Sequence, residues 1–372
     1  MKMLINKNIL LEGLNFVSKA LSSRNIIPVL NGIKFDLKKE GLYLTATDND
    51  ITIQYFIDKK DINAIEELGC IIIYGKSLLD IIRKLPETTI MIENFESNDV
   101  SFKTENAIFN FNCFLQEDFP EIVLEEAKKP IKLSSLKFKE MVSQTSFACS
   151  IQESRPLLTG VNIKVNGDNL ECIATDSYRL SKVIIKLNKS YDENTNIVVP
   201  AKNINEFIKT IEKDNELEIH TFANKAIFRH GNLIFQTSLL NGTYPNTDNS
   251  FPKEYKYEIE LNLKDFYNIL DRASLITQSK DKNIIDFDLN GNNIVIKASS
   301  QEMGKVEEKM SVVNKIGNNI KISFSAKYMI EALKIFKEKK IYLLLNGEIS
   351  PIIVKEENND ELIQLILPMK TY

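Results

Sequence analysis

Apolar and polar residues alternate along much of the chain with a period of two, and this pattern predicts β-strands that bury one face. The run "GIKFDLKKEGLYLTATDNDITIQYFI" (32–57) reads as a meander of such strands, with Lys-Glu-Gly as a turn signal. The later runs "TTIMIE", "DVSFKT" and "AIFNFNCF" alternate in the same way. The pattern therefore favours antiparallel sheets.

Two kinds of helical pattern interrupt the strands. In residues 6–21, Leu10, Leu14, Val17 and Leu21 recur at steps of four, three and four, which gives one apolar stripe. A second amphipathic pattern begins just after a strand in "YGKSLLDIIRKL" (74–85), "VPAKNINEFIKTI" (199–211) and "FSAKYMIEALKIF" (324–336). Helices that cover one face of an antiparallel sheet make an α+β fold.

These patterns recur three times. The words Ala-Thr-Asp begin at Ala46 and at Ala174, 128 residues apart, and Ala298 follows a similar apolar run 124 residues later. The first lysines of the second helices, Lys76, Lys202 and Lys327, are 126 and 125 residues apart. Repetition at a fixed period indicates repeated structural units. We expect three similar domains at 1–127, 128–252 and 253–372, with boundaries in the polar, proline-containing stretches "EEAKKP" and "SFPKEY".

Composition indicates an ordinary globular protein of the cytoplasm. The chain has 372 residues, of which 43% are hydrophobic and 26% charged. It contains neither an apolar run long enough to span a membrane nor the features of a secretory signal. Its four cysteines are scattered, which favours free thiols in a reducing compartment over disulfides or zinc.

Motifs of catalysis are missing from the sequence. There is no GxGxxG, P-loop, HExxH or GxSxG motif. Asp48 and Asp176 could form a carboxylate pair, but each follows a strand at the start of a turn, where Asp commonly bonds local backbone N–H groups. His220 and His230 could be neighbours across a hairpin, but no third metal ligand presents itself. We expect no enzymatic activity, no cofactor and no metal.

Six stretches carry a resemblance to a known family: "VSKALSSRNIIPVLNGI", "LTATDNDITI", "RPLLTGV", "ATDSYRLS", "LLNGTYP" and the terminal "LILPMKTY". They run through all three repeats, and together they resemble the bacterial sliding clamp, the beta subunit of DNA polymerase III. The resemblance implies three DNA-clamp domains in a half-ring, which closes as a head-to-tail homodimer around duplex DNA. Helices then line the hole, sheets form the outer wall, and the protein acts as a non-catalytic processivity factor.

A closed ring is compatible with the negative net charge of the chain. A net charge of −4 and a pI near 5.6 argue against holding DNA by charge alone, whereas a closed ring holds it by topology. The resemblance implies that Arg24, Gln152 and Lys202 touch DNA. The polar faces of the second helices add Arg83, Lys84, Lys209, Lys213, Lys334 and Lys337, although these could equally be solvated surface. No base-reading element is visible, so contact should be to phosphate and independent of sequence.

The resemblance also implies a hydrophobic cleft at the junction of the second and third domains, which receives short peptides of client proteins. Expected clients are the polymerase III alpha subunit or PolC, the delta subunit of the clamp loader, and mismatch repair and other proteins with the clamp-binding motif. Only the second repeat continues into Ser-Tyr-Arg-Leu, because only it meets the C-terminal tail. The matching positions are Leu158, Thr175, Ser177, Tyr178, Arg179, Leu180, Pro245, Ile349, Ser350, Leu365, Leu367, Pro368 and Met369.

Two places depart from the family pattern. Family members commonly carry Arg and then Val or Leu shortly after Tyr-Pro, where this chain has Asn249 and Ser250. The usual Gly-His reads Ser177-Tyr178. We expect clients to bind with an altered preference or a lower affinity.

A ring of two chains needs a seam. The resemblance places one side at Phe109 and Phe111 and the other at Leu275 and Ile276, where an alternating strand could extend the partner's sheet. Alternatively, the two phenylalanines face their own core.

Two other functions stay open on the residues alone. A hydrolase or transferase built on repeated domains would need convergent acids or a nucleophile–base pair, and a protein-binding scaffold that never meets DNA would need no basic residues around a central hole.

Overall fold

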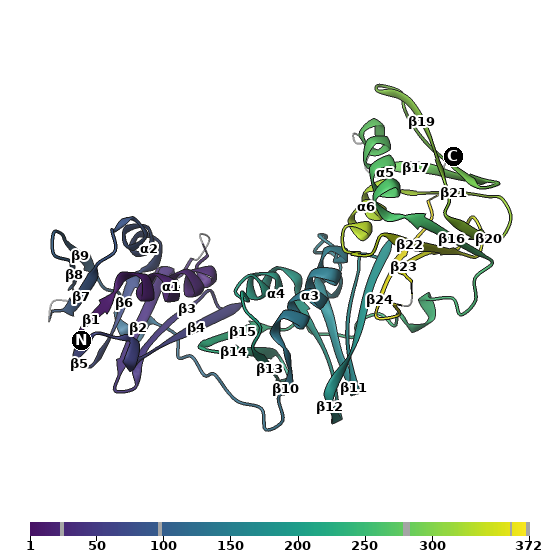
Figure 1. Ribbon diagram of the computed structural model, residues 1–372. Coiled ribbons are helices and arrows are strands. Elements are labelled where there is room, and N and C mark those ends of the chain that lie inside the picture. Colours follow the sequence, from purple (N-terminus) through teal and green to yellow (C-terminus); the bar gives the residue numbers. More distant parts are fainter. Residues whose placement is uncertain (23–25, 96–98, 278–282, 358, 370–372) are drawn as a thin grey trace. The chain divides into compact units, whose positions relative to one another are not determined.

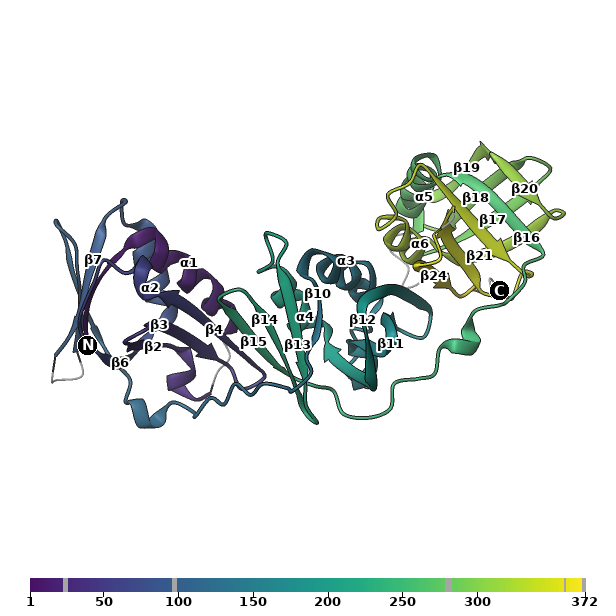
Figure 2. The same cartoon turned by 60° about the horizontal axis from the view of Figure 1, so that its bottom comes forward.

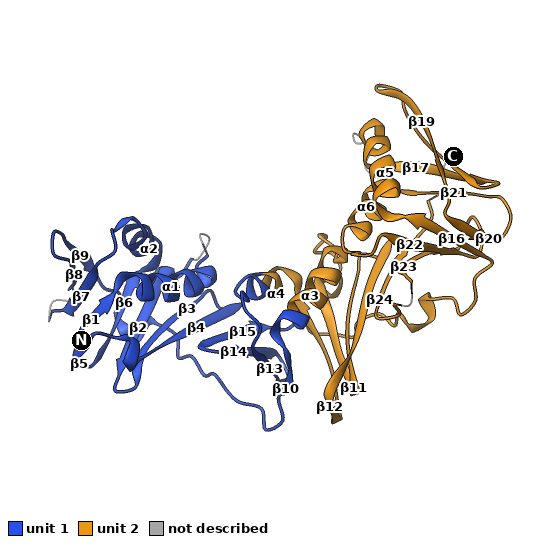
Figure 3. Cartoon of the chain, viewed as in Figure 1, with its two compact units in different colours: residues 1–138, 206–239 blue, residues 139–205, 240–372 orange. Residues whose placement is uncertain are grey.

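The computed structural model describes residues 1–22, 26–95, 99–277, 283–357 and 359–369. The chain divides into two compact units, one made of residues 1–138 and 206–239, the other of 139–205 and 240–372 (Figure 3). Two helices cross from one unit to the other along the chain, α3 (Ser135–Thr145) and α4 (Ala201–Ile208). The domain boundaries expected at 127/128 and 252/253 stay a prediction.

The described part of the first unit contains two antiparallel sheets. The smaller has the order β5-β1-β7-β8-β9, with strands Ala64–Glu67, Lys2–Asn6, Thr89–Asn94, Asp99–Lys103 and Ile108–Asn112. The larger has the order β10-β13-β14-β15-β4-β3-β2-β6, with strands Ile131–Ser134, Glu216–Thr221, Lys225–His230, Leu233–Ser238, Ile51–Asp58, Gly41–Thr47, Gly32–Lys38 and Gly69–Tyr74. The meander predicted at 32–57 is confirmed, because β2, β3 and β4 pair in sequence.

Helices α1 (Lys7–Val17) and α2 (Gly75–Lys84) lie against each other, and α1 packs on β3 and β4 (Figure 1). Leu10, Leu14 and Val17 are fully buried, which confirms the predicted stripe. Leu21 differs from the prediction: the α-helix ends at Val17, a 3-10 turn follows, and the Leu21 side chain is half-buried. Gly13 permits the close packing, since a Cβ there would lie 2.7 Å from Leu44 Cδ1.

The described part of the second unit also contains two antiparallel sheets. One has the order β11-β12-β24-β23-β22-β16-β20, with strands Gly160–Thr175, Arg179–Pro200, Leu362–Ile366, Ile352–Glu356, Lys340–Leu345, Tyr257–Asn262 and Asn314–Ile316. The other has the order β19-β18-β17-β21, with strands Gly304–Ser311, Asn293–Ser300, Ile284–Asn290 and Ile320–Ser325. Helices α5 (Leu263–Thr277) and α6 (Ala326–Leu333) contact each other, and α5 packs on β17, β18 and β19 (Figure 2).

Clustered phenylalanines fill the cores. In the first unit the Phe207 ring lies 4.9 Å from that of Phe228 and 5.3 Å from that of Phe235, between ring centroids, and all three are fully buried. Burying a large apolar side chain stabilises the fold by about 1.5–3 kcal/mol. None of the helices in the described ranges combines the length and apolar character that crossing a membrane requires.

Candidate functional site

The two Thr-Asp motifs, Thr47-Asp48 and Thr175-Asp176, form turns of the same kind. Thr47 Oγ1 donates to Ile51 O at 2.8 Å, and Thr175 Oγ1 donates to Arg179 O at 2.6 Å. The carboxylate of Asp48 accepts backbone N–H groups at 3.1 and 2.9 Å, and that of Asp176 accepts them at 2.9 and 3.0 Å. The interpretation that both aspartates bond their local backbone is confirmed.

The second turn differs from the first in the strand that comes after it. Strand β12 begins at Arg179 and pairs with β24, with Arg179 opposite Ile366 and Leu180 opposite Leu365. The backbone N–H of Leu367 then donates to Tyr178 O at 2.9 Å. The Ser-Tyr-Arg-Leu segment therefore lies beside the C-terminal segment, as the resemblance implied.

Arg179 is the most highly connected side chain of this turn. It is buried, and its guanidinium bonds Asp176 Oδ2 at 3.1 Å and Phe147 O at 2.8 Å. It also forms an ion pair with Glu331 of α6. The rings of Phe147 and Tyr328 lie near the same guanidinium, at 5.3 and 4.6 Å from ring centroid to Cζ. Sequence reasoning missed Phe147, Tyr328 and Glu331, because nothing in their local pattern marks a distant arginine.

A cleft of about 470 Å³ opens beside this turn, within the second unit. Nine of the thirteen expected peptide-binding residues line it: Leu158, Thr175, Ser177, Tyr178, Arg179, Leu180, Pro245, Leu365 and Leu367. The resemblance also implied that Asn249 and Ser250 lie there, and both line the cleft. Four further lining residues were not expected, namely Asn246, Thr247, Pro252 and Pro351.

The floor of the cleft is apolar and buried. Leu158, Leu180 and Leu365 are buried in one cluster with Ile173 and Tyr244. The Tyr244 hydroxyl accepts the backbone N–H of Thr175 at 3.2 Å, and burial raises the pKa of this phenol. Such a pocket with a few fixed polar groups at its edge suits a short peptide with apolar anchors.

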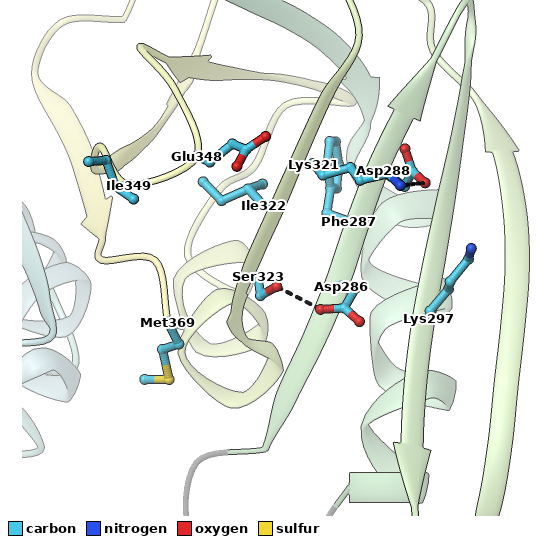
Figure 4. Close-up of a pocket in the computed structure, with 10 residues that line it drawn as sticks. All are labelled: Asp286, Phe287, Asp288, Lys297, Lys321, Ile322, Ser323, Glu348, Ile349 and Met369. Atoms are coloured by element: carbon cyan, nitrogen blue, oxygen red, sulfur yellow. Dashed lines mark hydrogen bonds and ion pairs between the residues drawn. The ribbon is translucent and has the colours of Figure 1, made fainter. Parts of the chain in front are cut away.

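Two of the remaining expected residues, Ile349 and Met369, line a second pocket of about 510 Å³ (Figure 4). Its other wall is formed by β17 and β21, where Ser323 Oγ donates to Asp286 at 2.6 Å and Lys321 pairs with Asp288 at 3.5 Å. The N–H of Met369 donates to Ser323 O at 2.7 Å, so the segment 367–369 borders both pockets. Ser350 and Pro368 line neither pocket.

The candidate DNA-contacting residues are exposed where the structure describes them: Gln152, Lys202, Arg83, Lys84, Lys209 and Lys334. Arg24 lies outside the described residues. Two of the set have local partners, since Arg83 pairs with Asp80 at 3.7 Å and Lys209 with Glu206 at 2.7 Å.

The candidate seam residues lie on or beside edge strands. β9 ends the smaller sheet of the first unit, and β19 ends a sheet of the second unit. Phe109 and Phe111 on β9 are half-buried, and the Phe111 ring packs edge-on against the buried Phe102 at 5.4 Å. Leu275 on α5 is 58% exposed, and Ile276 is half-buried. Phe111 thus faces its own core in part, as the alternative interpretation held.

The two histidines are not neighbours across their hairpin. His220 lies opposite Ile227 and His230 lies opposite Leu217, so they point to opposite faces of the sheet. No group of three potential metal ligands is found within the described ranges. Instead, His220 Nδ1 accepts the N–H of Ala127 at 2.9 Å. This hydrogen bond connects the irregular segment around Ala127 to strand β13.

Comparisons with known proteins cover the whole chain. Models of the N-terminal, central and C-terminal domains of the DNA polymerase III beta subunit match residues 1–123, 132–246 and 249–370. The beta sliding clamp of Bacillus subtilis is 36% identical over 378 residues and that of Staphylococcus epidermidis 34% over 377, with complete coverage of each chain. The crystal structure of the DNA polymerase sliding clamp from Bacillus subtilis superposes with a TM-score of 0.96 at 35% identity, and that of the beta chain from Streptococcus pneumoniae with 0.95 at 30%, again over all of both chains.

Proposed function

Because the chain belongs to the DNA polymerase III beta subunit family, the beta sliding clamps, we propose that two copies close into a ring around duplex DNA and tether the replicative polymerase there. The chain consists of three DNA-clamp domains and is a non-catalytic processivity factor of this family. We place the domains at 1–127, 128–252 and 253–372, with the first boundary between two matched segments and the second a few residues inside the match to the C-terminal domain.

The observation that carries the tethering proposal is the cleft beside Arg179. Residues from four separate segments, represented by Leu158, Leu180, Pro245 and Leu365, converge on it. The polymerase alpha subunit or PolC, the clamp loader delta subunit and mismatch repair proteins dock there through short peptides with leucine and aromatic anchors. Apolar anchors in a desolvated pocket carry most of the binding energy of such contacts.

Ring closure uses the edges at β9 and β19. An edge strand leaves backbone N–H and C=O groups unpaired, and a second chain can satisfy them by adding its own strand. Ile108 on β9 is 64% exposed, and Leu275 projects from α5 beside β19. In the proposed dimer these apolar side chains cover each other while the two sheets join.

DNA contact is weak and independent of sequence. The exposed Lys202, Lys84 and Lys334 meet phosphates through the hole, while the net charge of −4 keeps the ring free to slide. The protein acts in the cytoplasm, on the chromosome.

A topological experiment tests the ring. The clamp loader places the labelled protein on nicked circular DNA, and unbound protein is removed by gel filtration. We expect the protein to stay on the circle in 0.5 M NaCl and to leave when a restriction enzyme linearises the DNA. Release from the circle by salt, or retention on blunt linear DNA, would contradict encirclement and would favour ordinary charge-based binding.

A peptide experiment tests the cleft. A labelled peptide of the Gln-Leu-x-Leu-Phe type is titrated into the protein, into a Leu367→Ala variant and into a variant lacking residues 367–372. We expect micromolar binding that weakens about tenfold in Leu367→Ala and is lost on truncation. An exposed change in the first unit that does not line the cleft, Leu136→Ala, is the control, and equal binding to all four proteins would refute this location.

A further inference from the structure

An irregular segment of the first unit connects the N-terminal domain, matched up to residue 123, to the central domain, matched from residue 132. Phe119 is buried in one cluster with Leu30, and Ile122 packs against that cluster. The segment then runs past β14 and β13 and enters β10 at Ile131 (Figure 1). We call residues 122–127 the strap. It connects the two domains separately from the ladder in which β4 pairs with β15.

Two cationic side chains of β14 hold the middle of the strap. Arg229 Nη2 donates to Leu124 O at 3.4 Å and pairs with Glu126 at 3.2 Å. Lys225 pairs with Glu125 at 3.5 Å. The side chains of Glu125 and Glu126 are 48% and 69% exposed, and ion pairs exposed to this degree contribute little stability. The hold on the strap therefore depends strongly on its contact with β13.

The strap lies on the face of the sheet that points away from the helices. Phe228 of β14 points to the helix side, where its ring lies 4.9 Å from that of Phe207 on α4. Its neighbour Ile227 points to the opposite face, and so does His220, which is paired with Ile227 across the ladder. Ile227 and His220 are nevertheless 0% and 2% exposed. Since the strap bonds directly to this face, we infer that it covers these side chains.

The hydrogen bond between His220 and Ala127 requires a neutral imidazole. His220 Nδ1 accepts the N–H of Ala127 at 2.9 Å, so the neutral ring carries its own proton on Nε2. A second proton would have to bind Nδ1. Two N–H groups would then face each other, and the hydrogen bond that holds the end of the strap would be lost.

Charged groups of β13, β10, β14 and the strap face this imidazole. Glu218 Oε2 lies 3.4 Å from His220 Nε2, and Glu218 Oε1 lies 2.6 Å from Lys132 Nζ. Arg229 and Glu126 act from β14 and from the strap. Burial lowers the pKa of His220, Arg229 lowers it further, and the two glutamates oppose this shift. The covered imidazole therefore takes up a proton less readily than one in water.

We propose that the strap is a releasable connection between the N-terminal and central domains, and that protonation of His220 releases it from β13. In the released strap the imidazole meets water and titrates near its ordinary pKa of about 6.5. The released state then binds more protons than the bound state, so release is favoured as the pH falls below that value. The β4–β15 ladder holds the two domains when the strap is free. This inference depends neither on the proposed ring nor on the peptide cleft.

Limited proteolysis tests the release. A glutamyl endopeptidase cleaves after Glu125 and Glu126 when the strap leaves the sheet, and mass spectrometry measures the rate. The wild type and His220→Gln, whose amide oxygen can accept the Ala127 N–H without titrating, are digested at pH 7.2 and at pH 5.5. The ratio of the two rates at each pH cancels the pH dependence of the protease. His230→Gln is the matched control, because His230 points to the opposite face of the sheet.

We expect the ratio of wild type to His220→Gln to rise by about three- to ninefold between pH 7.2 and pH 5.5, where the upper value follows from a pKa of 6.5 in the released strap. His230→Gln should follow the wild type at both values. A ratio that does not change with pH would overturn the proposal. A rise that is abolished in His230→Gln would overturn it as well, because it would assign the response to the other histidine.

Hydrogen exchange distinguishes release of the strap from unfolding of the sheet. After correction for intrinsic exchange rates, the strap amides of the wild type should lose protection at pH 5.5 while those of β13 and β14 keep it. Simultaneous loss in the strap and in both strands would overturn the proposal, because the sheet and the strap would then open as one unit. If His220→Gln does not fold, this comparison within the wild type decides.

Discussion

The guanidinium of Arg179 lies 4.6 Å from the ring centroid of Tyr328, so the turn after β11 is tied to helix α6. The ion pair with Glu331, from the same helix, strengthens this tie. Because Arg179 also lines the cleft, the contacts that hold it in place also shape the proposed peptide site.

Replacing Arg179 by Ala should lower the free energy of unfolding by about 3 kcal/mol, since it leaves two carboxylates facing a buried site. Glu331→Gln should cost about 1 kcal/mol, because Asp176 remains and Glu331 is partly exposed. Urea midpoints measure both. Lys186→Ala is the control, because Lys186 lies on the same strand as Arg179 and forms an exposed ion pair with Asp168 of β11. Equal midpoints for Arg179→Ala and Lys186→Ala would contradict the assignment.

The turn at Ser177 predicts a gain of stability. Ser177 has φ +76°, a left-handed conformation that costs most residues about 1 kcal/mol and costs glycine nothing. Ser177→Gly should therefore raise the free energy of unfolding by about 0.5–1 kcal/mol, despite the loss of an exposed bond to Arg155. Asn49 has the same φ in the sister turn, and asparagine tolerates it better, so Asn49→Gly should gain less. A lower urea midpoint for Ser177→Gly than for the wild type would count against backbone strain at this turn.

Acidification should destabilise the first unit through His220. Burial lowers the pKa of this imidazole, and the nearby Arg229 lowers it further, while Glu218 and Glu126 oppose the shift. The unfolded chain then takes up the proton first, so stability is complete above about pH 6.5 and falls as the pH drops below it.

The free energy of unfolding, measured by urea titration, should therefore decrease between pH 7 and pH 5, by at most about 1.4 kcal/mol per pH unit for one proton. His220→Gln should flatten the slope, because the amide oxygen can accept the Ala127 N–H without titrating. His230 has a pKa lowered by burial in the same direction, so His230→Gln measures its separate share. A slope unaffected by His220→Gln would show that this histidine takes up its proton equally in the folded and the unfolded states.

Dimerisation should depend on the exposed end of α5. Leu275→Ala together with Ile276→Ala should raise the dissociation constant of the dimer at least tenfold, because apolar anchors at the centre of an interface are the groups whose truncation costs most. Sedimentation at a series of dilutions measures the change. Leu136→Ala, which removes a 42% exposed leucine from α3, is the matched control. A dissociation constant that does not move in the double variant would place the seam elsewhere.

The helices and strands of each repeat could be predicted because the pattern of apolar residues that specifies them extends over only a few neighbouring residues. The stripe of Leu10, Leu14 and Val17 and the meander at 32–57 each follow from neighbours a few residues apart. The brace around Arg179 could not be predicted, since Phe147 and Glu331 lie 32 and 152 residues away along the chain. The resemblance assigned thirteen residues to one cleft. The structure shows that most of them line one of two pockets, with Leu367 in the first and Met369 in the second, and this difference depends on the three-dimensional arrangement of residues distant in sequence.

Strands β9 and β19 are unlike edges of one chain, so the proposed contact joins two different surfaces. Such a contact does not by itself determine how many chains the assembly contains. Whether it closes after two copies or continues as a filament depends on the angle through which each copy turns the next. A substitution far from either edge that altered this angle would convert a ring into a fibre while leaving every contact between the chains intact.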